Sequence, residues 1–176
     1  MRIISGKNKG RRISAPKKLA VRPTTNRAKE ALFNIITNRY KLDETSVLDL
    51  FSGFGNISYE FASRGTSNII AVDNNLSCIK FIKKISEELE MDIDCIHSDS
   101  LRFLNKMNDI EKFDIVFADP PYNYTKYDDI IEITMSKNIL KKGGIVVLEH
   151  DNKKIFEQEN VETRKYGTVH FSIFQF

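Results

Sequence analysis

The stretch Ile115-Val116-Phe117-Ala118-Asp119-Pro120-Pro121-Tyr122 decides the fold, because an apolar run stops there at a polar tetrapeptide. A short continuous apolar run of this kind is typical of a strand buried in a parallel sheet. The chain has four prolines, and two of them are adjacent here. Proline fixes its own φ and favours extended geometry in the residue before it, so a stiff loop is predicted after the strand.

The tetrapeptide also has a defined hydrogen-bonding character. Neither proline carries an N–H, so the Asp119 carboxylate and the Pro120 carbonyl are two acceptors without donors from the prolines beside them. Tyr122 adds an aromatic face on which an unstacked base can lie. A nucleobase amine with two N–H bonds fits these features. The alternative for Tyr122 is a partly buried tyrosine beside a turn.

From residue 46 onward, short apolar runs alternate with amphipathic stretches, which is the pattern of repeated βα units. The runs are residues 47–51, 69–72, 93–96, 113–118 and 145–148. Helical spacing connects Ile79, Ile82, Ile85 and Leu89, and also Leu101 and Leu104. Residues 161–166 and 168–176 flank Gly167 and predict an antiparallel hairpin. The sequence therefore predicts an α/β fold with a mostly parallel sheet.

Ligands of such sheets bind beyond the carboxyl ends of the strands, and four runs end in acids. Asp49 lies at the end of the first run, where a buried carboxylate requires donors or a cation. After it, Gly53 and Gly55 permit a tight turn close to a ligand, before a helix near Asn56.

The second and third runs end at Asp73 and Asp99. Asp73 is either an acceptor for two ribose hydroxyls or the cap of the helix that starts near Leu76. Asp99, between Ser98 and Ser100, is either an acceptor for an adenine amine or the cap of the next helix.

The charge is asymmetric. Residues 1–30 contain ten Lys or Arg and one acid, whereas the rest of the chain has a net charge of −6. A basic arm on an acidic body predicts contact with a polyanion, and nucleic acid is favoured over a solvated tail. Residues 2–6 and 10–13 flank Lys7-Asn8-Lys9 and predict a short β-hairpin. An irregular linker with Pro16 and Pro23 then leads to a helix over residues 27–39.

The 176 residues suffice for one substantial core, so we expect residues 26–176 to form one domain with residues 1–25 as a basic extension. No apolar run approaches the roughly 18 residues of a membrane span, and a basic segment follows Met1. Cys78 and Cys95 have no metal-site spacing with each other or with the three histidines. These features predict a soluble cytoplasmic protein with reduced cysteines and no metal, and we expect a monomer.

The tetrapeptide, the sequence Asp-x-Phe-x-Gly-x-Gly at 49–55 and the acids at 73 and 99 resemble the class I S-adenosylmethionine-dependent amino-methyltransferases. Residues 22–34, 2–6 and 164–168 make the chain similar to the bacterial guanine-N2 methyltransferases of 16S ribosomal RNA, the RsmD type. The resemblance runs nearly end to end. It implies a Rossmann-like fold with a mostly parallel seven-stranded sheet, S-adenosylmethionine as cofactor, and 16S rRNA as partner, naked or within a partly assembled subunit.

The resemblance also implies roles for individual residues. Asp49, Gly53 and Gly55 are expected around the methionine part of the cofactor, Asp73 at the ribose and Asp99 at the adenine. The full predicted cofactor set is Thr24, Thr25, Asp49, Phe51, Gly53, Gly55, Asp73, Asn74, Asp99 and Ser100. The catalytic set, expected to hold the target base, is Asp119, Pro120, Pro121 and Tyr122. The predicted RNA contacts are Arg2, Lys7, Lys9, Arg11, Arg12 and Arg22.

The chain departs from the family pattern at Phe54, Ser58, Tyr59 and Ile85, which bears on cofactor affinity more than on the reaction. One alternative is a DNA adenine-N6 or cytosine-N4 methyltransferase, although residues 123–143 are too short for a target-recognition region. Another is a non-catalytic RNA-binding assembly factor, favoured by Phe54 and Ser58. A third alternative, a nicotinamide-dependent oxidoreductase, is disfavoured, because a dinucleotide-binding loop prefers glycine at the position of Ser58.

Overall fold

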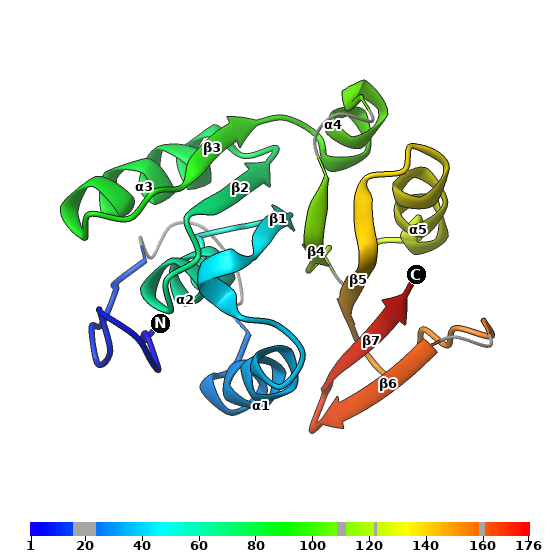
Figure 1. The fold of residues 1–176 in the computed structure, drawn as a ribbon, viewed down its shortest axis with the longest axis horizontal. Coiled ribbons are helices and arrows are strands. Elements are labelled where there is room, and N and C mark those ends of the chain that lie inside the picture. Colours follow the sequence, from blue (N-terminus) through cyan, green and yellow to red (C-terminus); the bar gives the residue numbers. More distant parts are fainter. Residues whose placement is uncertain (16–23, 109–111, 122, 159–160) are drawn as a thin grey trace.

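Seven strands form one mixed sheet in the computed structural model, which describes residues 1–15, 24–108, 112–121, 123–158 and 161–176 (Figure 1). The strand order is β3-β2-β1-β4-β5-β7-β6. The first five strands in this order pair in parallel, and β7 pairs antiparallel with both β5 and β6. The bounds are β1 Ser46–Leu50, β2 Asn68–Asp73, β3 Asp94–His97, β4 Phe113–Ala118, β5 Leu140–His150, β6 Val161–Tyr166 and β7 Val169–Gln175.

Helices cover both faces of the sheet (Figure 1). They are α1 Asn26–Thr37, α2 Asn56–Ser63, α3 Leu76–Glu88, α4 Ser100–Lys106 and α5 Tyr127–Ser136, with a 3₁₀ turn at Leu42–Glu44. Successive strand side chains point to opposite faces. Accordingly, Val47 packs in a core cluster with α1, α2 and α3, whereas Leu48 packs in a second cluster with α4 and α5. The predicted α/β fold is confirmed.

The predicted elements differ from the structure mainly at their ends. Strand β5 begins at Leu140 rather than Ile145, because Leu140 pairs with Phe113 across a register shift. Residues 141–144, two lysines and two glycines, hide this strand start in the sequence. Helix α1 ends at Thr37, two residues before the predicted end. Helix α5 was not predicted separately.

The N-terminal segment folds back on itself through one antiparallel bridge, Arg2 with Arg12, but the two predicted strands are not formed. The amides of Ile3 and Ile13 donate to the carbonyls of Arg11 and Met1, at 2.9 and 3.0 Å. The amides of Ile4 and Ser5 donate instead to the Glu60 carboxylate of α2, at 2.9 and 3.0 Å, so the pairing does not extend into two strands. The predicted linker lies mostly outside the described residues.

A buried ion pair fastens this loop to the body. Lys29 of α1 and Glu60 of α2 are 3.2 Å apart, with side chains 1% and 0% exposed. Lys29 Nζ also donates to the Arg2 carbonyl at 2.8 Å and to Asn56 Oδ1 at 2.9 Å. Burial lowers the pKa of Lys29 despite its partner. The loop also contributes Ile3 to the core cluster of α1, α2 and α3, so it is part of the folded body.

Candidate active site

A cavity of about 430 Å³ opens where β1, β2, β4 and β5 end. Because β7 runs antiparallel to β5, its first residue reaches the same edge. The lining residues are Thr24, Thr25, Asp49, Phe51, Ser52, Gly53, Phe54, Asn56, Ile57, Asp73, Asn74, Asn75, Cys78, Asp99, Phe117, Asp119, Pro120, Pro121, Tyr124, Tyr127, Glu149, His150, Thr168 and Val169. Sequence segments up to 145 residues apart therefore meet in one site.

The loop between β1 and α2 turns sharply beside the cavity. Phe51, Gly53 and Gly55 have positive φ values of 59°, 52° and 79°. A Cβ on Gly55 would lie 2.9 Å from the Tyr59 ring, so this glycine allows α2 to pack closely. Phe51 and Gly53 line the cavity, whereas Gly55 lies behind its wall.

Asp49 is 1% exposed and faces the cavity from the end of β1. Ser58 Oγ, fully buried, donates to Asp49 Oδ2 at 2.5 Å. Burial outweighs this bond and raises the pKa of Asp49 to about 7. Ser58, which departs from the family pattern, thus supplies one of the donors that a buried carboxylate requires.

Asp73 is held by backbone donors. Its carboxylate accepts from the amides of Gly53 and Asn75, both at 2.8 Å. Burial raises its pKa even so. The cap of α3 is Asn75, whose side chain accepts from the Ser77 amide, so Asp73 is not the helix cap. Its carboxylate lines the cavity, and the ribose role stays a prediction.

Asp99 does cap a helix: its Oδ1 accepts from the Arg102 amide at 2.9 Å, at the start of α4. Asp99 lines the cavity as well, so the cap leaves an adenine contact open. Ser100, the other predicted residue here, is buried and does not line the cavity.

The strand-ending motif of β4 forms another wall of the cavity. Asp119, Pro120 and Pro121 line it, and the Pro121 carbonyl accepts from the Tyr124 amide at 2.8 Å. Burial, and then the charges of Glu149 and Asp49, raise the pKa of Asp119 well above its usual range. Two predicted site residues, Tyr122 and Arg22, lie outside the described residues.

Sequence reasoning missed several lining residues, most notably Glu149. It follows the apolar run 145–148, so the strand-end rule that selected the other four acids also points to it. Tyr124 and Tyr127 were missed too; their rings are 5.4 Å apart and continue to Phe51 at 5.1 Å from Tyr124. Tyr127 is the first residue of helix α5, so a prediction of that helix from the sequence would have pointed to Tyr127.

The charge of the cavity is one-sided. Five of its residues are acids, namely Asp49, Asp73, Asp99, Asp119 and Glu149, and its described lining includes no Lys or Arg. Carboxylates removed from water are costly unless a cation or donors accompany them. The residues therefore fit a ligand that carries positive charge.

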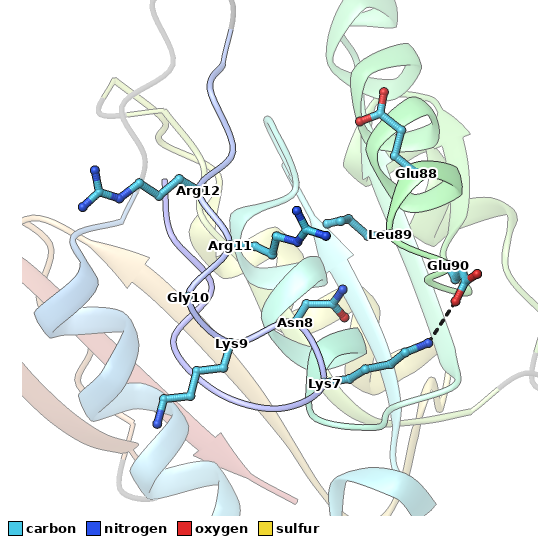
Figure 2. A pocket seen from close by; sticks show the side chains of 9 residues that line it. All are labelled: Lys7, Asn8, Lys9, Gly10, Arg11, Arg12, Glu88, Leu89 and Glu90. Atoms are coloured by element: carbon cyan, nitrogen blue, oxygen red, sulfur yellow. Dashed lines mark hydrogen bonds and ion pairs between the residues drawn. The ribbon is translucent and has the colours of Figure 1, made fainter.

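The predicted RNA contacts gather at the N-terminal loop. Residues 7–12 and the C-terminal end of α3, residues 88–90, line an open basin on the surface (Figure 2). Lys7 reaches Glu90 at 3.2 Å, whereas Lys9 and Arg12 extend away from α3. Arg2 lies outside this basin and pairs with Arg12 through the backbone. The loop thus presents exposed cations.

No group of three or more His, Cys, Asp or Glu side chains suited to a metal ion occurs among the described residues. No helix in the described part of the chain is long and apolar enough to cross a membrane. Both cysteines are free; Cys78 is buried, and burial raises its thiol pKa to about 11.

Residues 1–175 match the family described as Conserved hypothetical protein 95. The chain belongs to this family. A relative from Buchnera aphidicola subsp. Baizongia pistaciae, named Ribosomal RNA small subunit methyltransferase D, is 32% identical and covers 99% of this chain and 91% of its own. A putative rRNA methyltransferase of Bacillus subtilis is 33% identical, covering 99% and 98%. The resemblance to the RsmD type is thus confirmed.

Among solved structures, a putative methylase from Haemophilus influenzae has a TM-score of 0.79 and 26% identity, covering 99% of this chain and 97% of the other. This chain therefore has the Rossmann-like fold of class I methyltransferases.

Proposed function

We propose that this protein transfers a methyl group from S-adenosylmethionine to the exocyclic N2 amine of a guanine in 16S ribosomal RNA. One observation carries the proposal: the acceptor motif Asp119-Pro120-Pro121 and the acids Asp49 and Asp73 line a single cavity at the strand ends. The names of the family relatives, small subunit rRNA methyltransferases, support RNA as the source of the base.

The ends of β1, β2 and β3 are the half of the cavity that suits the cofactor. Asp49 and Gly53 would hold the methionine part, Asp73 the ribose and Asp99 the adenine, with Phe51, Asn74, Thr24 and Thr25 around them. The cofactor supplies a methyl group on a positively charged sulfur, and the excess of carboxylates in the cavity suits that charge. Gly55 and Ser100 support these residues from behind the wall.

The end of β4 is the half that suits the base. An exocyclic amine is a weak nucleophile because its lone pair is delocalised into the ring. Two acceptors, the Asp119 carboxylate and the Pro120 carbonyl, would bind its two N–H groups and favour a tetrahedral nitrogen with an available lone pair. Orientation of the amine then provides most of the rate enhancement.

The amine must lose a proton once it has been methylated. The carboxylate of Asp119 is already next to this nitrogen in the proposed complex. Its raised pKa makes it a stronger base, and so a better proton acceptor near neutral pH, than an ordinary carboxylate. Asp119 or a water molecule would take the proton. No deprotonation is needed before transfer.

The base must leave its stack to enter the cavity, and Tyr122 is proposed to stack on it. Phosphates of the surrounding RNA are proposed to contact Arg2, Lys7, Lys9, Arg11, Arg12 and Arg22. An rRNA substrate would place the protein in the cytoplasm. We propose that residues 1–25 form an RNA-binding segment packed against the catalytic domain, and that the protein is a monomer without a metal.

Product analysis tests the proposal. Purified protein is incubated with labelled S-adenosylmethionine and either naked 16S rRNA or small subunits, and the RNA is digested to nucleosides. We expect label in N2-methylguanosine, and the better of the two substrates identifies the form that is recognised. Label in N6-methyladenosine or N4-methylcytidine, or no label with either substrate, contradicts the proposal.

Calorimetric titration with S-adenosylmethionine separates the enzyme from a non-catalytic assembly factor. Binding is expected, because Ser58 holds Asp49 in place and Phe54 packs edge-on against Phe81 at 5.2 Å, leaving neither substitution as a defect in the wall. Absence of binding favours the assembly factor.

A further inference from the structure

Glu149 lies beside Asp119 at the base half of the cavity. Strands β4 and β5 pair Ala118 with Leu148, so Asp119 and Glu149 are the next residues at neighbouring strand ends. Two residues earlier, Phe117 and Val147 share the core cluster of α1, α2 and α3. Strand alternation therefore directs both acids to that same face, and both line the cavity.

The Glu149 side chain is held in position. It belongs to a residue that is 8% exposed, and its Oε2 accepts from Thr24 Oγ1 at 2.7 Å. Glu149 has other interactions besides this bond. An ionised carboxylate has about four lone-pair sites, so it can accept a further donor from a ligand.

The bases differ in the atom next to their amine. In guanine, the ring nitrogen N1 beside the N2 amine carries a hydrogen and is a donor. In adenine and cytosine, the ring nitrogen beside the amine is an unprotonated acceptor. A second carboxylate next to the one that binds the amine therefore attracts guanine and repels the lone pair of the other two bases.

We propose that Glu149 accepts the N1–H of the target base and thereby selects guanine, while Asp119 and the Pro120 carbonyl hold the amine. This assignment rests on the proposed function and gives it a reason for guanine that the Asp-Pro-Pro motif alone lacks. The neighbouring position of the two acids explains why the charge of Glu149 is the largest charge effect on the Asp119 pKa. Thr24 is the positioning residue for Glu149.

The test replaces the target guanine, once mapped, with 2-aminopurine or 2,6-diaminopurine in a ligated rRNA substrate. Both analogues keep the 2-amine and have an acceptor at N1. Because both also lack the O6 carbonyl of guanine, the assignment to N1 depends on how the preference changes in a Glu149 variant. We expect wild-type protein to prefer guanine over both in kcat/KM by about 10- to 100-fold, the range for one hydrogen bond to a charged group.

Glu149→Gln offers an amide that can donate to an N1 acceptor and can still accept from Thr24. We expect this variant to lose about 10- to 100-fold on guanine and to narrow or reverse the preference over both analogues. Asp151→Asn makes the same change two residues away, outside the cavity lining, and should keep the wild-type preference.

Two results overturn the role of Glu149. One is an unchanged ratio of guanine to analogue in Glu149→Gln while guanine is still methylated. The other is a loss confined to S-adenosylmethionine affinity, which would place Glu149 in the cofactor half. Failure of wild-type protein to methylate any guanine substrate contradicts the proposed function instead, so the two failures are distinguishable.

Discussion

At the scale of single residues, Asp119 is the group on which the proposed chemistry depends most. It is the only acid of the cavity, among the described residues, that belongs to the Asp-Pro-Pro motif. Asp119→Ala removes one of two preorganised acceptors, so we expect single-turnover methylation to slow by about 10²–10³ with cofactor affinity nearly retained.

Asp129→Ala serves as the matched control for that measurement, because Asp129 is an exposed acid in the first turn of α5. Its rate should match that of the wild type. A near-normal rate for Asp119→Ala in the same assay would remove Asp119 from the mechanism.

Asp49 links cofactor binding to pH. Its pKa is raised to about 7 by burial, so the ligand-free site holds a proton below that pH. A positively charged cofactor binds the ionised carboxylate and releases the proton. We therefore expect affinity for S-adenosylmethionine, measured by calorimetry, to be about tenfold weaker at about pH 6 than at about pH 8.

The Asp49→Asn variant should bind S-adenosylmethionine more weakly at both pH values and lose most of this pH dependence. An unchanged pH dependence would mean that another group causes it.

The raised pKa of Asp49 also makes the stability of the folded protein depend on pH. The unfolded carboxyl ionises near 3.8, before the folded one, so its protonated form contributes to the stability of the ligand-free protein fully below about pH 3.8, and this contribution is lost progressively as pH rises to about 7.

Single residues also mark the limit of sequence reasoning at this site. The strand-end rule finds Asp49, Asp73, Asp99 and Asp119, because chain order and sheet edge coincide in βα units. It does not reveal that Gly55 faces Tyr59 instead of the cavity, since that depends on how α2 packs.

At the scale of elements, the N-terminal loop is pinned to α2 at Gly6. A Cβ on Gly6 would lie 1.7 Å from the Ser63 carbonyl oxygen, and the Lys7 amide donates to that oxygen at 2.7 Å. We expect Gly6→Ala to displace the loop, weakening RNA binding in a filter or anisotropy assay while leaving cofactor affinity within about twofold.

Gly10→Ala is the control for the steric effect, because Gly10 also has a positive φ, of 88°, but nothing lies within 4 Å of its added Cβ. It should weaken RNA binding less than Gly6→Ala. Equal effects of the two variants would mean that backbone strain, and not contact with α2, determines how the loop is placed.

The exposed cations of the loop give a second prediction at this scale. Lys9, Arg11 and Arg12 are exposed and have no ion pair within the described part of the chain. If each contacts a phosphate, changing all three to Gln should reduce the slope of log affinity against log salt by about 2 to 3.

An equal loss of charge elsewhere, with Lys80, Lys106 and Lys142 changed to Gln, should leave the slope nearly intact; these lysines are exposed too. Similar slopes for the two triple variants would mean that the loop acts only through net charge. Substitutions are preferable to deletion of residues 1–13, because deletion also removes Ile3 from the core.

Elements were predictable where local pattern and tertiary context agree. Strands β4 and β6 have the predicted bounds, because an apolar run marks β4 and the turn at Gly167 ends β6. The two strands predicted for the N-terminal loop are not formed: its pairing is limited to one bridge, and the amides of Ile4 and Ser5 donate to the buried carboxylate of Glu60, more than fifty residues away in sequence. Pairing over that separation is not visible in a local pattern.

At the scale of the whole molecule, the charge is divided between an acidic cavity and a basic loop. The parallel sheet brings five carboxylates to one edge, whereas the cations of the loop lie on a surface basin beside α3 (Figure 2). This division suits a cationic cofactor in the cavity and an RNA backbone outside it. Composition predicted the basic loop, and the strand-end rule predicted four of the five acids at a common edge; Glu149 was the acid that was missed.

The central claim is that this cavity methylates the N2 amine of a guanine in 16S rRNA. Its most direct test is mass mapping of 16S rRNA from cells that lack the protein and are supplied with either the wild-type chain or Asp119→Ala. We expect one guanine to gain a methyl group on N2 with the wild type and to remain unmodified with Asp119→Ala. A methyl group at another base or atom, or an equal signal with both chains, would contradict the account.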